Sequence, residues 1–245
     1  MSAPLLLEMR GMCKSFPGVR ALQEVDFELR AGEVHVLLGE NGAGKSTLMK
    51  ILSGAYRSDA GEVRLEGRRV RLHPPVEARR LGINTIYQEC SLVPHLPVYA
   101  NVFLGRERCL GGGILDRRGM RRAAREILHD LGIELDPEVR ISRLSIAQQQ
   151  MVEIARALAF TARIIVMDEP TSALTQTEIR KLFGLIRAVR KRGVGIVYIS
   201  HRMEEIMEVG DRVTVLRDGR RVASGRVAEV TIPQLIRWID RKSVV

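Results

Sequence analysis

Cysteine and aromatic residues are scarce in this chain. Its 245 residues include 3 cysteines, 1 tryptophan, 4 tyrosines and 5 phenylalanines. Cys13, Cys90 and Cys109 are odd in number and lack metal-ligand spacing, which predicts reduced thiols rather than a disulfide framework or a zinc site. The 4% aromatic content argues against the base-stacking surfaces of single-stranded nucleic-acid binders.

Long hydrophobic runs are also absent. No stretch approaches the roughly 20 apolar residues of a membrane-spanning helix, and the N-terminus has no cationic lead of a secretory signal. The formal net charge of +10 is spread along the chain, densest in Arg117–Arg125 and Arg187–Arg192 on predicted helices. Solvated helix faces explain this charge, and contact with anionic lipid or an acidic partner surface is the alternative.

A phosphate-binding loop is the clearest motif present. The sequence GENGAGKS, Gly39–Ser46, fits the pattern GxxxxGK[ST] between a predicted buried strand, Val34–Leu38, and a predicted helix, Thr47–Leu52. In such loops backbone N–H groups bind phosphate oxygens, the lysine reaches the β- and γ-phosphates, and the serine hydroxyl binds Mg²⁺. The predicted nucleotide-binding residues of this segment are Gly39, Asn41, Gly42, Ala43, Gly44, Lys45, Ser46 and Thr47.

A second anchor lies in RIIVMDEP, Arg163–Pro170. Its apolar residues predict a buried strand whose C-terminal tip carries Asp168, at the edge where ligands gather in parallel sheets. Asp168 is placed there to hold Mg²⁺ through water, and Glu169 to polarise a water for attack on the γ-phosphate. An ordinary acidic turn is the alternative, which the neighbouring phosphate loop disfavours.

Three further residues are candidates with open alternatives. Gln88 and His201 each end a predicted strand, where a polar side chain can touch Mg²⁺, the attacking water or the γ-phosphate, or can simply belong to a loop. Phe16, in Phe-Pro-Gly, either covers the core in a turn or stacks on adenine.

Ser145–Gln148, SIAQ, predicts the start of a helix. S-x-x-Q is a capping box, in which Ser145 is the N-cap and Gln148 returns its side chain. In this interpretation the segment only starts a helix. A capped helix N-terminus, however, also offers N–H groups and a positive dipole to an anion. Both readings are compatible.

The order of predicted elements indicates an α/β nucleotide-binding core, residues 1–88 plus 161–245, interrupted by a mostly helical insert, residues 89–160. The core begins with two strands of a small antiparallel sheet, Leu5–Met12 and Val25–Leu29, and a separate hairpin is predicted from Val63–Leu65 with Val70–Leu72. Apolar runs predict the other strands at Ile83–Tyr87, Arg163–Met167, Val194–Ile199 and Val213–Leu216. Helical periodicity marks Val76–Leu81, Met120–Leu131, Ser145–Phe160, Thr177–Lys191, Met203–Val209 and Ile232–Ile239.

Together these motifs resemble the ATP-binding-cassette (ABC) ATPases over nearly the whole chain. The resemblance rests on Phe16, Gly39–Thr47, Gln88, LSIAQQQMVEIARAL from Leu144 to Leu158, IIVMDEPTSAL from Ile164 to Leu174, and His201. It implies a RecA-like P-loop core with an antiparallel β subdomain and a helical insert, acting as an ATPase with Mg²⁺. It also implies that Gln88 senses Mg²⁺ and the γ-phosphate, that Glu169 is the general base and that His201 contacts the γ-phosphate.

The same resemblance assigns Ser145, Ile146, Ala147 and Gln148, the signature segment, to the ATP held by an opposed cassette, which implies a head-to-tail pair with two ATP molecules. Within the family the chain is similar to the first half of tandem ATPases that drive ribose-, galactose- and xylose-type importers. The implied partners are a second cassette, a membrane permease and, indirectly, a periplasmic sugar-binding protein, with no nucleic acid. The implied location is the cytoplasmic face of the cell membrane.

Two departures from the common family pattern bear on these expectations. LSIAQ replaces LSGGQ, so Ile146 and Ala147 leave less room for backbone approach to phosphate. SALT replaces SALD, which puts Thr175 at the expected cassette interface. We expect the ATP site completed by this signature to be the weaker one. The alternatives are a soluble cassette ATPase of DNA repair or translation, a silent regulatory module, or an exporter cassette.

Overall fold

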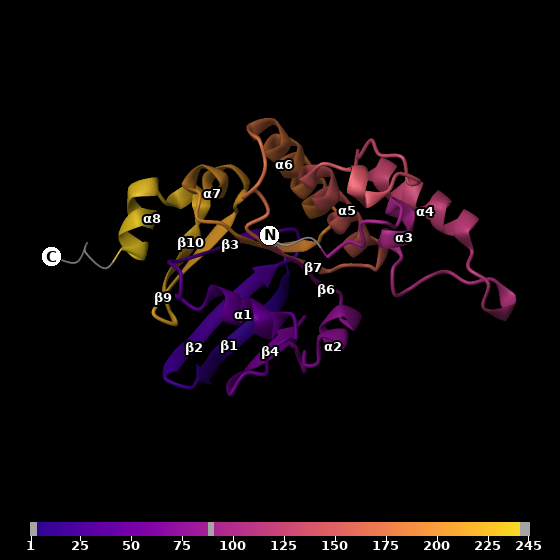
Figure 1. The fold of residues 1–245 in the computed structure, drawn as a ribbon. Helices are drawn as coiled ribbons and strands as arrows, with labels where there is room; N and C mark the ends of the chain where they lie inside the picture. Colours follow the sequence, from indigo (N-terminus) through magenta and orange to yellow (C-terminus); the bar gives the residue numbers. More distant parts are fainter. Residues whose placement is uncertain (1–3, 88–90, 241–245) are drawn as a thin grey trace. The chain divides into compact units, whose positions relative to one another are not determined.

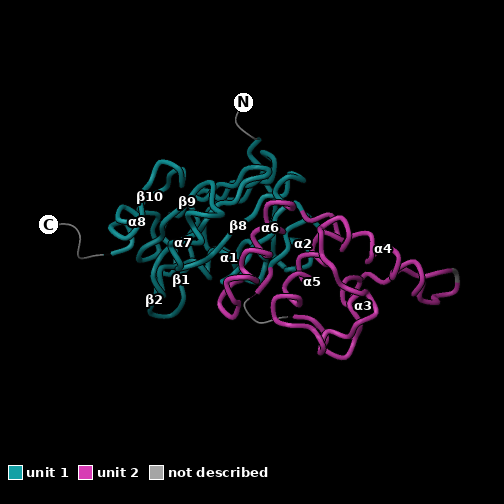
Figure 2. Tube along the Cα trace, turned by 90° about the horizontal axis from the view of Figure 1, so that it is seen from above, with its two compact units in different colours: residues 1–85, 163–169, 190–245 teal, residues 86–162, 170–189 magenta. Residues whose placement is uncertain are grey.

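A computed structural model of the protein describes residues 4–87 and 91–240 (Figure 1). The chain divides into two compact units, coloured teal and magenta in Figure 2. The first comprises residues 1–85, 163–169 and 190–245, and the second comprises residues 86–162 and 170–189. Over the described ranges, no helix combines the length and apolar character needed to cross a membrane.

A six-stranded sheet forms the centre of the first unit. Its strand order is β10-β9-β3-β8-β7-β6, and β3, β7, β8 and β9 pair in parallel. The bounds are β3 Val34–Leu38, β6 Ile83–Ile86, β7 Ile164–Asp168, β8 Gly195–Ile199, β9 Arg212–Arg217 and β10 Arg220–Arg226. Every residue of β3 and β8 is buried, as expected for strands covered on both faces. The predicted parallel core is therefore confirmed.

The predicted antiparallel sheet is also present, with order β2-β1-β4-β5. Its strands are β1 Leu5–Phe16, β2 Val19–Arg30, β4 Ala60–Leu65 and β5 Arg68–Val70. The first two are longer than predicted, because their paired ends around the Pro17–Gly18 turn are partly exposed and lack apolar alternation. Leu7, Phe27 and Leu37 share one buried core with residues of helix α1, Lys45–Leu52.

The second unit is mostly helical. It contains α3 Val98–Val102, α4 Arg117–Asp130, α5 Ile146–Ala159 and residues 176–189 of α6, Gln176–Lys191. Arg117, Arg118, Arg122 and Arg125 of α4 are exposed, which supports the solvated-face interpretation. Residues 170–189, which the sequence-based division placed with the nucleotide core, fall in this unit, where α5 and α6 line a common cavity of about 560 Å³. The sequence-based domain division itself stays a prediction.

Three further helices complete the regular structure of the described residues apart from short 3₁₀ turns. They are α2 Pro75–Arg80, α7 Met203–Val209 and α8 Ile232–Ile239. The predictions for α7 and α8 coincide with the observed bounds, and α2 begins one residue earlier than predicted. Pro75 stands at the first position of α2, where its missing N–H costs nothing.

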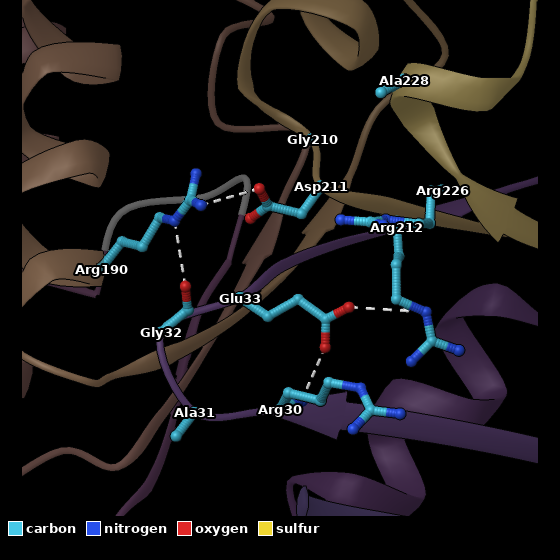
Figure 3. A pocket seen from close by; sticks show the side chains of 10 residues that line it. All are labelled: Arg30, Ala31, Gly32, Glu33, Arg190, Gly210, Asp211, Arg212, Arg226 and Ala228. Carbon is cyan, nitrogen blue, oxygen red and sulfur yellow. Dashed lines mark hydrogen bonds and ion pairs between the residues drawn. The ribbon is translucent and has the colours of Figure 1, made fainter. Parts of the chain in front are cut away.

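Ion pairs hold the sheet edge at which β3 and β9 begin (Figure 3). Arg190 pairs with Asp211 at 2.8 Å and donates from Nε to the Gly32 carbonyl at 3.0 Å. The Asp211 carboxylate in turn accepts from the Val34 N–H at 2.9 Å, at the start of β3. Glu33 accepts from the Arg30 N–H at 2.7 Å and lies 3.5 Å from Arg212 Nε, and burial raises the pKa of Glu33. These contacts fix the strand ends opposite the phosphate loop.

His35 is a buried histidine within β3. Its Nδ1 lies 2.6 Å from the Glu28 carbonyl oxygen and its Nε2 lies 2.8 Å from Thr214 Oγ1. A carbonyl only accepts, so Nδ1 carries the proton and Nε2 accepts from the threonine hydroxyl. Burial first, and the positive charge of Arg212 second, lower the pKa of His35 from 6.5 to about 3.

His35 is expected to make the protein less stable in mild acid. Because the unfolded chain takes up a proton near pH 6.5 and the folded chain only near pH 3, the unfolded state binds more protons between these values. The free energy of unfolding contributed by this group therefore falls by about 2 kcal/mol from pH 7 to pH 5. Urea unfolding of wild type and His35→Gln at both pH values measures it. Equal losses in the two proteins would contradict the assignment, and His129→Gln, at an exposed position, is the control.

Candidate active site

The phosphate loop connects β3 directly to α1 in the first unit. Gly44, the N-cap of α1, has φ +102°, and a Cβ there would lie 2.6 Å from the Ala21 carbonyl oxygen. Gly39, the first residue of the loop, has φ +153°, and its Cβ would meet the Leu216 carbonyl oxygen at 2.3 Å. Only glycine fits both positions. The first turn of α1 has no side-chain cap and no acidic residue, which leaves its N–H groups for an anion.

Lys45 folds back over the loop that precedes it. Its Nζ donates to the carbonyl oxygens of Gly39 at 2.7 Å and Glu40 at 3.0 Å. Burial lowers the pKa of Lys45, and the carboxylates of Glu169 and Asp168 oppose this shift. The ammonium and both carboxylates therefore act on one another at the same edge of the sheet, as the sequence predicted for the phosphate loop and the acidic strand tip.

Asp168 and Glu169 lie at the carboxyl end of β7. Burial, followed by the neighbouring Glu169, raises the pKa of Asp168, while Lys45 and Lys50 lower it. Glu169 donates its N–H to the Ile199 carbonyl at 3.0 Å, which continues the pairing of β7 with β8 by one residue. Its φ is +46°, the left-handed region that L-residues other than Asn and Asp seldom adopt. The strand pairing and this turn direct the Glu169 side chain toward the end of β8.

His201 follows β8 and contacts Glu169. Its Nδ1 lies 3.1 Å from Glu169 Oε1, although 70% of the imidazole is exposed. Sequence reasoning missed the residue that anchors this turn, the buried Glu205 of α7, whose carboxylate accepts from Tyr198 and Ser200. The available signal was a glutamate at a position of a short helix where the pattern calls for an apolar residue. It was overlooked because an acidic residue in the first turn of a helix is usually explained by its favourable interaction with the helix dipole.

The structure describes Phe16, one of the predicted nucleotide-binding residues, but not Gln88. Phe16 ends β1, is 37% exposed and stacks edge-to-face on Tyr56 with ring centroids 5.4 Å apart. The Lys14 ammonium lies 5.6 Å from the centroid of the same ring, and adenine stacking by Phe16 stays a prediction. Gln88 lies outside the described residues, so its predicted contact with Mg²⁺ and the γ-phosphate also stays a prediction.

The signature segment in the second unit begins α5 as a capping box. The Ser145 N–H donates to Gln148 Oε1 at 2.9 Å, and Ser145 Oγ accepts from the Gln148 N–H at 3.3 Å. The structural half of the prediction is confirmed. Ala147 is 4% exposed and Ile146 is 53% exposed. Of the two residues that replace glycines in the signature segment, only the isoleucine therefore presents a side chain at the surface. The Ile146 side chain occupies space that a glycine would leave open.

The donor set suits Mg²⁺ bound together with a nucleotide. The Ser46 hydroxyl, exposed at the start of α1, and the half-buried Asp168 carboxylate are hard oxygen donors of the kind this ion prefers. No cluster of three or more His, Cys, Asp or Glu side chains able to hold a metal alone occurs in the part of the chain that is described.

A buried parallel sheet carrying a glycine loop, a lysine and an acidic strand tip at one edge defines a P-loop nucleotide-binding domain. Residues 22–172 match the sequence profile of the ABC transporter family, and the chain belongs to this family. The match runs from β2 through the phosphate loop and the signature helix to Thr171 and Ser172, just after Glu169.

Among curated proteins, the ribose import ATP-binding protein RbsA 1 of Rubrobacter xylanophilus is 58% identical over 240 residues, 98% of this chain and 48% of that protein. A putative ribose/galactose/methyl galactoside import ATP-binding protein 2 of Burkholderia cenocepacia is 51% identical over 94% of this chain and 45% of that protein. The chain thus spans about half the length of the curated relatives it matches.

Solved structures give the same fold. An ATP-binding cassette of an ABC transporter in its ADP conformation superposes with a TM-score of 0.84 at 25% identity, covering 96% of this chain and 98% of that one. A nucleotide-free ATP-binding cassette from an ABC transporter superposes with a TM-score of 0.81 at 24% identity. The predicted fold class, an α/β cassette with an antiparallel β subdomain and a helical insert, is confirmed.

Proposed function

We propose that this chain is the ATP-hydrolysing cassette of a monosaccharide importer, corresponding to the first half of a tandem ATPase. The observation that carries the proposal is the position of Asp168 and Glu169 at the carboxyl end of β7, in the sheet whose strand β3 leads into the phosphate loop, with His201 3.1 Å from Glu169. The identity of 50–58% to proteins named for ribose or galactose import supports the substrate class. The rival functions in DNA repair or translation have no comparable support.

ATP lies in this proposal along the loop Gly39–Ser46. Its phosphate oxygens accept from the loop N–H groups and from α1, whose dipole favours negative charge. On ATP binding, Lys45 exchanges its two loop carbonyls for the β- and γ-phosphates. Ser46 and Asp168 would hold Mg²⁺, which would supply positive charge to neutralise the phosphates.

Hydrolysis depends mainly on positioning and on charge stabilisation around the γ-phosphate. Glu169 accepts a proton from the attacking water, and His201 contacts the γ-phosphate. The left-handed turn at Glu169 and its contact with His201 set the distance between these two groups. Phe16 covers the adenine, and Gln88 completes the Mg²⁺ and γ-phosphate contacts.

Coupling to transport requires a second cassette. Ser145 and Gln148 at the start of α5 bind the γ-phosphate of the ATP held by the opposed cassette, so two ATP molecules close the pair and hydrolysis reopens it. Ile146 makes the site completed by this signature the weaker of the two. The assembly lies at the cytoplasmic face of the membrane, against a permease that receives sugar from a periplasmic binding protein.

Uptake of labelled ribose, galactose and xylose by cells that carry the full-length protein and its permease tests this function. Lys45→Ala is expected to abolish uptake of one of these sugars, because transport then lacks its ATP-driven closure. Unchanged uptake, together with an ATPase activity stimulated by nucleic acid or ribosomes, would instead identify a soluble cassette of another class.

A further inference from the structure

Glu205 is a buried carboxylate in the first turn of α7. The residue is 4% exposed, although α7 is only a seven-residue helix at the surface of the first unit. Moving a carboxylate out of water is costly unless its oxygens are bonded, and an apolar residue of similar size is often as stable or more so. A buried charge at this position is therefore not explained by stability alone, and the contacts of the carboxylate suggest that it holds a particular backbone conformation.

The contacts of Glu205 surround the turn that carries His201. Oε2 accepts from the Tyr198 hydroxyl and from the Ser200 hydroxyl, each at 2.9 Å, and Oε1 pairs with Arg202 at 2.9 Å. Ser200 Oγ also accepts from the Arg202 N–H at 3.1 Å. One carboxylate thus bonds three residues, at alternate positions on both sides of His201.

His201 itself has little packing to place it. Its side chain is 70% exposed and its contact in the site is with Glu169 at 3.1 Å. The place of an exposed side chain follows from its backbone, and here that backbone is fixed by the residues on either side. Tyr198 and Ser200, 0% and 3% exposed, are fixed by burial as well as by Glu205.

We infer that Glu205 is a positioning residue that sets His201 against Glu169 for attack on the γ-phosphate. The inference rests on the proposed function for its effect on turnover, but the placement of His201 is independent of it. Glu205 is buried and bonded to the residues that flank His201, so its effect on the site is exerted through His201. A fully bonded buried network of this kind selects one loop conformation, which an apolar residue at position 205 cannot do.

Steady-state ATP hydrolysis by the Glu205→Gln variant is the first test. Since the amide keeps the volume but cannot serve all three donors, kcat is expected to fall about tenfold or more, because a misplacement of about 1 Å in a catalytic group can cost about a hundredfold. KM for ATP is expected to stay within about twofold, because the phosphate loop is untouched. Glu204→Gln, the exposed neighbour in the same helical turn, is the matched control and keeps wild-type kcat. Tyr198→Phe, which removes one hydrogen bond and no charge, gives a smaller loss of kcat in the same direction.

Imidazole ¹H–¹⁵N NMR spectra separate positioning from general structural damage. The ring signals of His201, assigned with His201→Gln, are expected to shift in Glu205→Gln, whereas those of buried His35 in the same unit stay in place. Unmoved His201 signals, displaced His35 signals, or a wild-type kcat in Glu205→Gln would each overturn the inference. If the wild-type protein hydrolyses no ATP, the proposed function fails, while the NMR result still decides whether Glu205 places His201.

Discussion

Glu169→Gln is expected to bind ATP as tightly as the wild-type protein while turnover falls by about two to four orders of magnitude, the usual contribution of a general base. Glutamine keeps the side-chain length and an oxygen that accepts from His201 Nδ1, now 3.1 Å from Glu169 Oε1. It cannot take a proton from water at neutral pH. Binding and chemistry are therefore separated at one residue.

Phosphate release measures the turnover of this variant, and equilibrium titration with a fluorescent ATP analogue measures its affinity. Glu126→Gln on α4, which carries the same change at an exposed position, is the control and is expected to behave as wild type. Normal hydrolysis by Glu169→Gln would show that another group is the base. A parallel loss of affinity would show that Glu169 acts on binding instead.

Lys45→Ala is expected to weaken ATP binding by about a hundredfold or more, which corresponds to about 3 kcal/mol for two charge-assisted hydrogen bonds. The loop conformation remains available, because its turns are set by Gly39 and Gly44 rather than by the lysine. The phosphates would lose their nearest positive charge, and Asp168 and Glu169 would lose the ammonium that offsets their repulsion.

The same variant has a signature in the absence of nucleotide. Because Lys45 lowers the pKa of Asp168, its removal raises that pKa further. Affinity is measured by ATP titration and the pKa by carboxyl NMR. Lys191→Ala, at an exposed position of equal charge, serves as the control. An unchanged ATP affinity in Lys45→Ala would remove the phosphate loop from the proposed site.

Much of the fold and part of the site follow from sequence for identifiable reasons. The strand Val34–Leu38 was predicted with its observed bounds because a strand buried on both faces is a continuous apolar run closed by a glycine turn. The capping box at Ser145 was predicted because both of its hydrogen bonds are local. The proximity of Lys45 to Asp168 followed from the rule that parallel strands end at one edge.

Other features were hidden for equally physical reasons. Strand β10, Arg220–Arg226, was missed because it is an edge strand whose residues are all exposed or half-buried, so no apolar pattern marks it. Whether residues 170–189 group with the nucleotide core or with the helical insert does not follow from sequence, because a helix pattern does not state which neighbour the helix packs on. Glu205 was missed because its function depends on three donors that only the tertiary structure brings together.

The left-handed backbone at Glu169 lowers the stability of the fold, while the side chain at the same position is needed for hydrolysis. A non-glycine residue in the left-handed region costs about 1–2 kcal/mol, and Gly or Asn at position 169 relieves part of that cost. Both replacements delete the proton acceptor. Selection for heat resistance alone would therefore favour variants with a higher melting temperature that no longer hydrolyse ATP. Any programme that stabilises this protein should keep residue 169 unchanged.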